Sequence, residues 1–218
     1  MIGAVIAMQS EADILLNNMK ITQSLQISGK TIHIGKAYEK DVVVCVCGVG
    51  KVNAALGTQL LISKFDVHQI LNFGVAGSLN KETALCNVYQ ISHAVQFDFD
   101  LVQLNGTKIG TLNEYTENYL ALNALNLPFE KRKLGTADRF NDSHTDFELL
   151  TKELNADIRD MEGGAIVQVA YASSLPVYSL KAISDVAGSG STTEQYLINK
   201  DKALANLQAA LPTIFEAI

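Results

Sequence analysis

The chain has 218 residues, of which 48% are hydrophobic and 18% charged, a composition typical of a globular protein that buries a sizeable core. Its formal net charge of −6 gives no electrostatic footprint for nucleic acid or for an anionic membrane surface. No apolar run approaches the roughly 20 residues of a membrane span, and no basic segment precedes the apolar N-terminal residues, as it would in a signal peptide. We therefore expect one domain over residues 1–218, with neither a nucleic-acid nor a membrane partner.

Three cysteines are present, Cys45, Cys47 and Cys86. Cys45 and Cys47 are two residues apart in an apolar run, which places both side chains on one face of a strand. This spacing is neither a redox CxxC pair nor a zinc motif. An odd number of thiols in apolar surroundings predicts core packing in a reducing compartment, so we expect a cytoplasmic protein.

The N-terminal part of the chain predicts a strand, a helix and three more strands. Ile2–Met8 is an apolar run of strand length, and Ser10 is placed to cap a helix over Glu11–Asn18. Glu11 lies in the first turn of this helix, where a purely structural role against the helix dipole is an open alternative. Three further strands joined by hairpins are expected at residues 21–27, 31–37 and 41–47.

Two glycine-containing loops follow strands in the next part of the chain. Gly48–Gly50 lies between a strand and a helix start, and Gly74–Ser78 follows the strand predicted at 68–73. Glycines let the backbone turn sharply and approach a ligand closely. Gly48–Gly50 lacks the third glycine of a dinucleotide-binding fingerprint and is not a P-loop.

The middle of the chain is less regular. A strand is expected at 87–95, an irregular segment at 101–110, and a helix at 113–125 because its apolar residues have helical spacing. Asp98 and Asp100 are two residues apart, but without a histidine or a third carboxylate in register they favour loop or interface packing over a metal site. Phe140 is a further candidate for a ligand contact, and core packing is its structural alternative.

The C-terminal part places two more carboxylates at strand ends. Val177–Ile183 is an apolar run suited to a strand buried on both faces, and Ser184 and Asp185 follow it at once. Glu162 comes between a short strand and a helix of small residues at 163–174. Open α/β sheets bind ligands at the carboxyl ends of their strands, although Asp185 could instead only tighten the turn that follows.

The last helix is predicted over Thr192–Leu211, with an apolar stripe of Leu197, Leu204, Leu207 and Leu211. Strands and helices alternate along the chain without a linker, a repeat or a low-complexity segment. This alternation favours a single-domain, three-layer α/β/α sandwich with a mixed central sheet.

Several of these segments together resemble one protein family. DMEGGAIVQVA at 160–170 and LKAISDVA at 180–187 are similar to motifs in the nucleosidase branch of the purine nucleoside phosphorylase/uridine phosphorylase superfamily. AMQSE at 7–11, GVGKVNAALG at 48–57, GVAG at 74–77 and ADRF at 137–140 resemble further motifs of the same family. The resemblance covers most of the chain and is weakest between Phe97 and Leu134, where Phe97 replaces the family's usual histidine.

The resemblance implies a set of site residues. Asp185 would protonate the purine at N7, Glu11 would activate the attacking water, and Glu162 would hold the ribose hydroxyls, while Ser184 would orient Asp185. Apolar contacts to the ribose and the 5′ substituent would come from Met8, Val49, Leu101 and Met161. Val75, Ala76 and Gly77 would lie under the ribose, although many relatives carry a small hydroxyl residue where Val75 stands. Phe140 would stack on the purine.

The implied activity is hydrolysis of the N-glycosidic bond of 5′-methylthioadenosine or S-adenosylhomocysteine by a homodimer that uses no metal and no cofactor. Paired carboxyl groups suit this chemistry because one protonates the leaving group and another activates water. A phosphate-dependent nucleoside phosphorylase is the first alternative. None of the three arginines, Arg132, Arg139 and Arg159, lies in the loops expected around the ribose, which disfavours a phosphate site. A non-catalytic nucleoside-binding protein is the second alternative.

Overall fold

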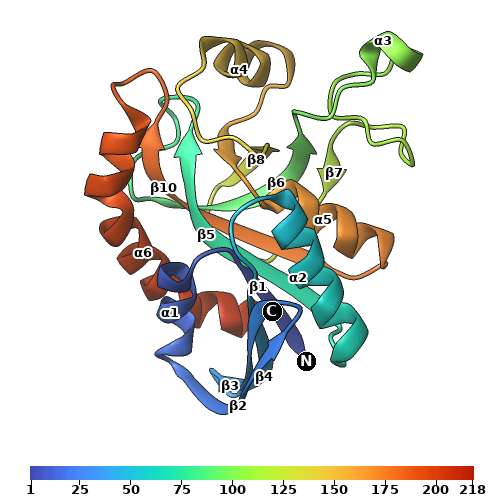
Figure 1. Cartoon of the computed structure of the whole chain (residues 1–218). Coiled ribbons are helices and arrows are strands. Elements are labelled where there is room, and N and C mark those ends of the chain that lie inside the picture. The colour runs from blue at the N-terminus through green and yellow to red at the C-terminus, as the bar shows by residue number, and fades with distance from the viewer.

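A computed structural model of the protein describes residues 1–218 and builds them around one ten-stranded sheet (Figure 1). The strands are β1 (Ile2–Ile6), β2 (Met19–Ile27), β3 (Lys30–Ala37), β4 (Lys40–Val46), β5 (Gln69–Ser78), β6 (Val88–Gln96), β7 (Leu120–Ala121), β8 (Lys131–Thr136), β9 (Ile158–Asp160) and β10 (Val177–Val186). The helices are α1 (Gln9–Leu16), α2 (Lys51–Lys64), α3 (Val102–Asn105), α4 (His144–Glu148), α5 (Gly163–Ala172) and α6 (Thr192–Ala217), and a π-helical turn, η1 (Leu149–Glu153), follows α4.

The sheet has an open half and a closed half. In the open half the strand order is β2-β3-β4-β1-β5, and β1 is parallel to both β4 and β5. Beyond it, β5 pairs with β10 on one side and with β9 on the other, so that β5, β10, β6, β8 and β9 close a ring. The mixed α/β fold with a mixed central sheet is therefore confirmed. The closure of half the sheet into a ring was not predicted.

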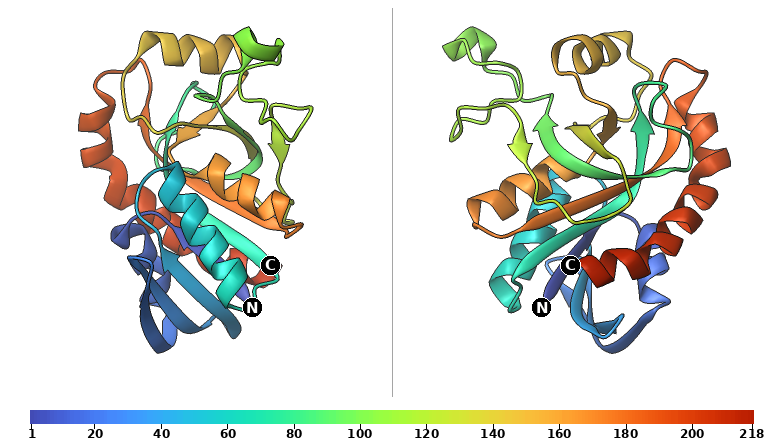
Figure 2. Two further views of the ribbon diagram at one scale, coloured as in Figure 1. Left: turned by 45° about the vertical axis from the view of Figure 1, so that its right-hand side comes forward. Right: turned by 180° about the vertical axis from the view of Figure 1, so that it is seen from behind.

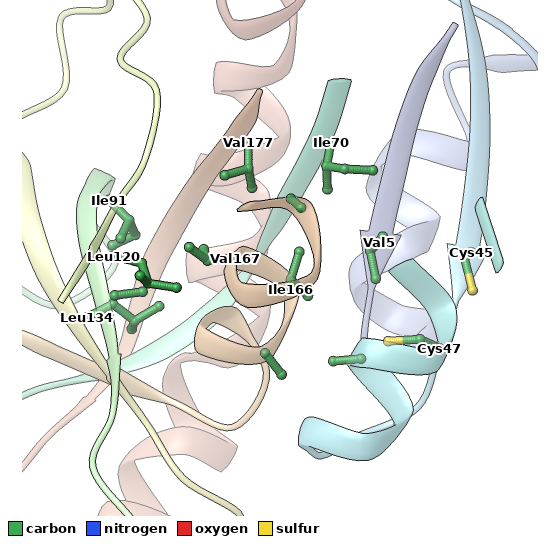
Figure 3. Packing of buried hydrophobic residues seen from close by; sticks show 14 of the residues in the cluster. Val5, Cys45, Cys47, Ile70, Ile91, Leu120, Leu134, Ile166, Val167 and Val177 are labelled. Atoms are coloured by element: carbon green, nitrogen blue, oxygen red, sulfur yellow. The ribbon is translucent and has the colours of Figure 1, made fainter. Parts of the chain in front are cut away.

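Helices cover both faces of the sheet (Figure 2). On one face α2 packs against α5, and on the other α1 packs against α6. Figure 3 shows the first of these interfaces, where Ile166 and Val167 of α5 lie between strand residues such as Val5 and Val177. Burial of each such side chain stabilises the fold by about 1.5 to 3 kcal/mol. Packing on both faces therefore fixes the strands whose loops are described below.

The three cysteines are buried and none forms a disulfide. Burial raises the pKa of the thiols of both Cys45 and Cys47 to about 12. These side chains therefore remain uncharged core residues, as the sequence predicted.

The helix predicted at 113–125 is wrong. This segment is irregular apart from β7, which pairs with β6. Tyr115 instead packs edge-on against Tyr171 of α5, with ring centroids 5.4 Å apart. The free edge of β6 and this aromatic contact outweigh the helical spacing, because tertiary contacts override weak local propensities.

No helix combines the length and the apolar character that crossing a membrane would require.

Candidate active site

One cavity of about 390 Å³ opens where the loops after several strands meet the start of α6. It is lined by Ala7, Met8, Glu11, Val49, Val75, Ala76, Gly77, Phe140, Arg159, Asp160, Met161, Glu162, Ser184, Asp185, Thr193, Tyr196 and Leu197. Every residue that the sequence assigned to the site is in this set except Leu101. The structure therefore brings together side chains that are far apart in the sequence, while their individual roles remain predictions.

Leu101 does not line the cavity. It is the residue immediately before α3, in the segment that leaves the sheet after β6, and α3 stands away from the body of the molecule in Figure 1. The chain carries Leu101 outward before β7 returns to the sheet, so its substrate contact stays a prediction.

Glu11 is held in place by two backbone donors. Its Oε2 accepts a hydrogen bond from Met8 N at 3.1 Å, and its Oε1 accepts one from Val75 N at 2.8 Å. The first bond makes Met8, and not Ser10 as predicted, the N-cap of α1. A Cβ at Gly74 would lie 2.4 Å from Oε1, so a glycine is required beside this carboxylate. Only 3% of Glu11 is exposed, which is far more burial than a helix-dipole role needs.

Burial raises the pKa of Glu11 above its usual value. The positive charge of Lys181 and the two backbone hydrogen bonds act in the opposite direction and favour the carboxylate. Both oxygens thus accept bonds from N–H groups, which stabilise the charged form, in a setting where desolvation makes that carboxylate more basic.

Glu162 lies at the N-cap of α5 and is also buried. Its Oε1 accepts a hydrogen bond of 2.8 Å from Gly50 N, and Gly50 adopts a φ of +100° that suits glycine. Burial and the neighbouring Asp160 raise the pKa of Glu162 to about 7, against the positive charge of Lys181. The glycine loop after β4 therefore orients a carboxyl group that comes from the other half of the sheet.

Asp185 lies at the end of β10, where an irregularity in the pairing with β5 interrupts the register between Ile183 and Asp185. Bulges of this kind re-aim side chains at active sites. Oδ2 of Asp185 accepts a hydrogen bond of 2.9 Å from the Ser184 hydroxyl, whereas the buried Oδ1 has no hydrogen-bond partner. Burial raises the pKa of Asp185, although Ser184 and Arg159 act against this shift.

The sequence did not predict the buried ion pair between Lys181 and Asp160. Lys181 Nζ lies 2.9 Å from Asp160 Oδ2, and each side chain is only 2% exposed. Asp160 also accepts hydrogen bonds from Thr136 Oγ1 and Gly163 N. Burial alone would lower the pKa of Lys181, but Asp160, Glu162 and Glu11 outweigh it and raise that pKa. The signal in the sequence was the single charge inside the apolar run of β10.

Several of the remaining residues that line the cavity are aromatic or apolar. The Phe140 ring lies edge-on to Tyr196, with centroids 5.8 Å apart, and Tyr196 Oη lies 3.6 Å from Met8 Sδ. Phe140 is 50% exposed, so core packing does not explain it. Leu197 is 71% exposed and lines the cavity, so its place in the predicted apolar stripe is wrong, whereas Leu204, Leu207 and Leu211 are buried as expected.

Charged side chains around the cavity are mostly paired. Lys51 forms an ion pair with Asp98, which also accepts a hydrogen bond from Asp138 N. No group of three or more histidine, cysteine, aspartate or glutamate side chains is arranged to hold a metal ion. Arg159 lies outside the three loops expected around the ribose, as predicted, but it does line the cavity and lies beside Asp185.

The fold and this cavity, with buried carboxyl groups delivered by separate loops, are those of a nucleoside-processing protein. The sequence matches the family model of the phosphorylase superfamily over residues 1–216, and the chain belongs to this family.

Two curated relatives are similar over nearly the whole chain. The 5′-methylthioadenosine/S-adenosylhomocysteine nucleosidase of Buchnera aphidicola is 32% identical, with 98% of this chain and 88% of the relative covered. The aminodeoxyfutalosine nucleosidase of Campylobacter jejuni is 27% identical, with 92% and 93% covered. Among solved structures, the Helicobacter pylori 5′-methylthioadenosine/S-adenosylhomocysteine nucleosidase with butyl-thio-DADMe-Immucillin-A has a TM-score of 0.91 at 23% identity and covers 100% of this chain and 98% of its own. This last likeness confirms the fold.

Proposed function

We propose that this protein is a nucleosidase that hydrolyses the N-glycosidic bond of 5′-methylthioadenosine or S-adenosylhomocysteine and releases adenine and the thio-substituted ribose, a step of methionine salvage. The observation that carries the proposal is the convergence of Glu11, Glu162 and Asp185 from three separate loops on one cavity. The relatives named above support the substrate class. The whole chain, residues 1–218, acts in this proposal as one nucleosidase domain.

The acid and the base are distinguished by their hydrogen bonds. Asp185 keeps one buried oxygen free and has a raised pKa, so it can carry a proton and give it to N7 of the leaving purine. The Glu11 carboxylate takes a proton from water, whose oxygen forms the new bond to the anomeric carbon. The C–N bond breaks, and its electron pair leaves with the protonated base. General acid–base catalysis of this kind contributes about 10² to 10⁴-fold.

In this proposal Glu162 accepts hydrogen bonds from the ribose hydroxyls. Its carboxyl group is already oriented by Gly50 N, and contact with the hydroxyls steadies the sugar as positive charge develops at the anomeric carbon. Phe140 and Tyr196 supply the apolar surface expected for a purine ring. Met8, Val49 and Met161 supply the apolar contacts of the ribose and the 5′ substituent.

Hydrolysis is favoured over phosphorolysis by the charges around Glu11. Lys51 is paired with Asp98 and does not line the cavity, and Lys181 is paired with Asp160. Arg159 is the one cation that lines the cavity, and it lies beside Asp185. A phosphate at about 4 Å from the Glu11 carboxylate would be repelled by roughly 4 kcal/mol at an effective dielectric constant of about 20. A neutral water meets no such repulsion.

The experiment is product analysis with a panel of 5′-methylthioadenosine, S-adenosylhomocysteine, adenosine and aminodeoxyfutalosine, with and without phosphate. The expected products are adenine and free pentose at a rate independent of phosphate. Phosphate-dependent release of a pentose 1-phosphate would establish the phosphorylase alternative. Tight binding of one of these nucleosides, with no turnover of any of the four, would establish the non-catalytic alternative.

We also propose that the protein is a cytoplasmic homodimer. Three buried free thiols suit a reducing compartment. Val52 of α2 and Leu104 of α3 are each 79% exposed, and a second copy of the chain would remove such side chains from water. Light scattering coupled to size-exclusion chromatography measures the mass directly, and a monomer at micromolar concentration would reject the dimer.

A further inference from the structure

The side chain of Arg159 has no hydrogen bond to any group of the chain, although it is only 12% exposed. Its buried Nη2 lacks a partner, and so does the buried Oδ1 of Asp185. These two atoms lie 3.9 Å apart. Buried polar groups are nearly always hydrogen-bonded, so two unpartnered groups of opposite charge side by side in a cavity indicate a shared role.

The sheet places the two side chains in one row. Asp185 of β10 and Arg159 of β9 are both paired with Gly77 of β5, one from each side. A Cβ at position 77 would lie 2.7 Å from Asp185 Oδ1 and 3.3 Å from Arg159 Nε. The missing side chain of Gly77 therefore opens the space in which the guanidinium and the carboxyl group meet. This contact exists only because β9 closes the ring against β5.

We propose that Arg159 is a positioning residue that acts through Asp185: it holds the carboxyl group toward the base and stabilises the carboxylate that forms when Asp185 gives up its proton. This inference rests on the proposed nucleosidase function. The proton passes from Asp185 to the base nitrogen, the electrons of the C–N bond leave with the base, and the negative charge left on Asp185 faces Arg159. The next turnover begins when solvent returns a proton to Asp185 and takes one from Glu11.

The other groups that face Asp185 do not supply this charge. The Ser184 hydroxyl bonds Oδ2, Asp142 from the loop before α4 is negative and raises the pKa of Asp185, and Tyr196 of α6 is neutral, with its own pKa raised mainly by burial. Burial and Asp142 raise the pKa of Asp185, the Ser184 hydrogen bond lowers it, and Arg159 is the cation that lowers it further. An opposite charge nearby favours the ionised form of a carboxyl group, so Arg159 makes Asp185 a stronger acid than its burial alone would allow.

The test compares Arg159→Met, Arg159→Gln and Arg159→Lys with Arg132→Met. Arg132 is a matched control because its side chain is similarly buried, at 16% exposed, but pairs with Glu130 and does not line the cavity. The pH dependence of kcat/KM is measured for all variants, and the Asp185 carboxyl is titrated in the free protein by ¹³C NMR. Urea unfolding identifies the variants that fold, and Arg159→Gln replaces Arg159→Met if the latter does not.

Loss of the positive charge is expected to lower kcat by about tenfold or more with a smaller change in KM, and to move the Asp185 titration and the alkaline limb of the profile upward by about one pH unit. Arg159→Lys should restore most of the lost kcat and most of the Asp185 titration shift. Arg132→Met should change neither kcat nor the Asp185 titration. An unchanged Asp185 titration in folded Arg159→Met or Arg159→Gln overturns the inference, as does a rise in KM with kcat and the pH profile unchanged. Failure of the wild type to release adenine would instead reject the proposed function, and the NMR titration still decides the Arg159–Asp185 interaction.

Discussion

The two ends of the cavity hold carboxyl groups in opposite ways. At one end Glu11 accepts hydrogen bonds from two backbone N–H groups, one on each oxygen. At the other end Asp185 accepts one hydrogen bond, from Ser184, and leaves Oδ1 free beside Arg159. Burial raises the pKa of both groups. Burial alone therefore does not distinguish acid from base, whereas the hydrogen bonds do: two fixed donors favour a carboxylate, and a free oxygen has room for a proton.

The largest effect is expected at the Asp185 end, from a change in the substrate. A 7-deaza analogue of the adenosine substrate cannot be protonated at position 7. It should bind to the wild type but show almost no cleavage, a loss of about 10⁴-fold, the upper end of what one general acid contributes, because the atom that Asp185 would protonate is absent. Competition assays measure binding, and adenine-analogue release measures turnover. Cleavage at the rate of the natural nucleoside would remove Asp185 from the role of acid.

The Glu11 end is tested by Glu11→Gln. The amide cannot take a proton from water, so kcat should fall by about 10² to 10⁴-fold. One of the two backbone donors would then face the amide NH₂ group, at an expected loss of about 1 to 3 kcal/mol in unfolding free energy. Asp13→Asn on the same helix is the control, because Asp13 bonds Gln9 and does not line the cavity. Near-normal turnover of Glu11→Gln would reduce Glu11 to a structural cap.

The buried pair below both ends is tested by Lys181→Met. This change leaves Asp160 buried without its cation and should lower the free energy of unfolding by about 3 to 5 kcal/mol. The double variant with Asp160→Asn should recover part of the loss. Lys36→Met is the matched control, because the Lys36–Asp41 pair is exposed and such pairs contribute about 1 kcal/mol or less. Urea denaturation measures the free energy of unfolding of all these variants. Equal losses of this free energy in Lys181→Met and Lys36→Met would contradict a structural role of the buried Lys181–Asp160 pair.

A smaller effect with a defined pH dependence is expected at Glu162. Its pKa is raised from 4.5 to about 7 in the folded protein, so the folded state favours the protonated form. The wild type should therefore lose stability as the pH rises from the unfolded pKa through the folded one. At about 1.4 kcal/mol per unit, the loss is about 3 kcal/mol. Glu162→Gln removes this penalty and should unfold at higher urea concentration than the wild type at pH 8, but not at pH 4.

An equal stability difference between Glu162→Gln and the wild type at pH 4 and pH 8 would show that the Glu162 carboxyl is not perturbed by folding. Gln is the appropriate replacement because its side-chain oxygen can still accept the hydrogen bond from Gly50 N.

The sequence predicted most of the cavity because its residues follow strands. Asp185 was found at the end of one apolar run, and Glu11 in the first helical turn after another apolar run. Because the carboxyl ends of parallel strands meet at one edge of a sheet, the two side chains were expected close together. Arg159 and Lys181 were not assigned to the site, because their partners depend on strand pairings that local patterns do not encode. Arg159 reaches Asp185 only because β9 pairs with β5 next to Gly77.

The same limit explains the errors elsewhere. Apolar spacing at 113–125 predicted a helix, but the neighbouring strand β6 supplies backbone partners to β7. Leu197 has the spacing of a core residue, yet the first turns of α6 extend over the cavity, where it lines the wall.

The division of labour between the two ends can be tested most directly with two leaving groups in one experiment. Asp185→Asn, Glu11→Gln and the wild type are compared on 5′-methylthioadenosine and on a 4-nitrophenyl riboside, whose phenolate departs without a proton. Asp185→Asn should lose about 10² to 10⁴-fold on the adenosine substrate but stay within about tenfold of the wild type on the aryl riboside, whereas Glu11→Gln should be impaired on both. Equal impairment of Asp185→Asn on both substrates, or an aryl riboside activity of Glu11→Gln equal to that of the wild type, would contradict the assignment of Asp185 as acid and Glu11 as base.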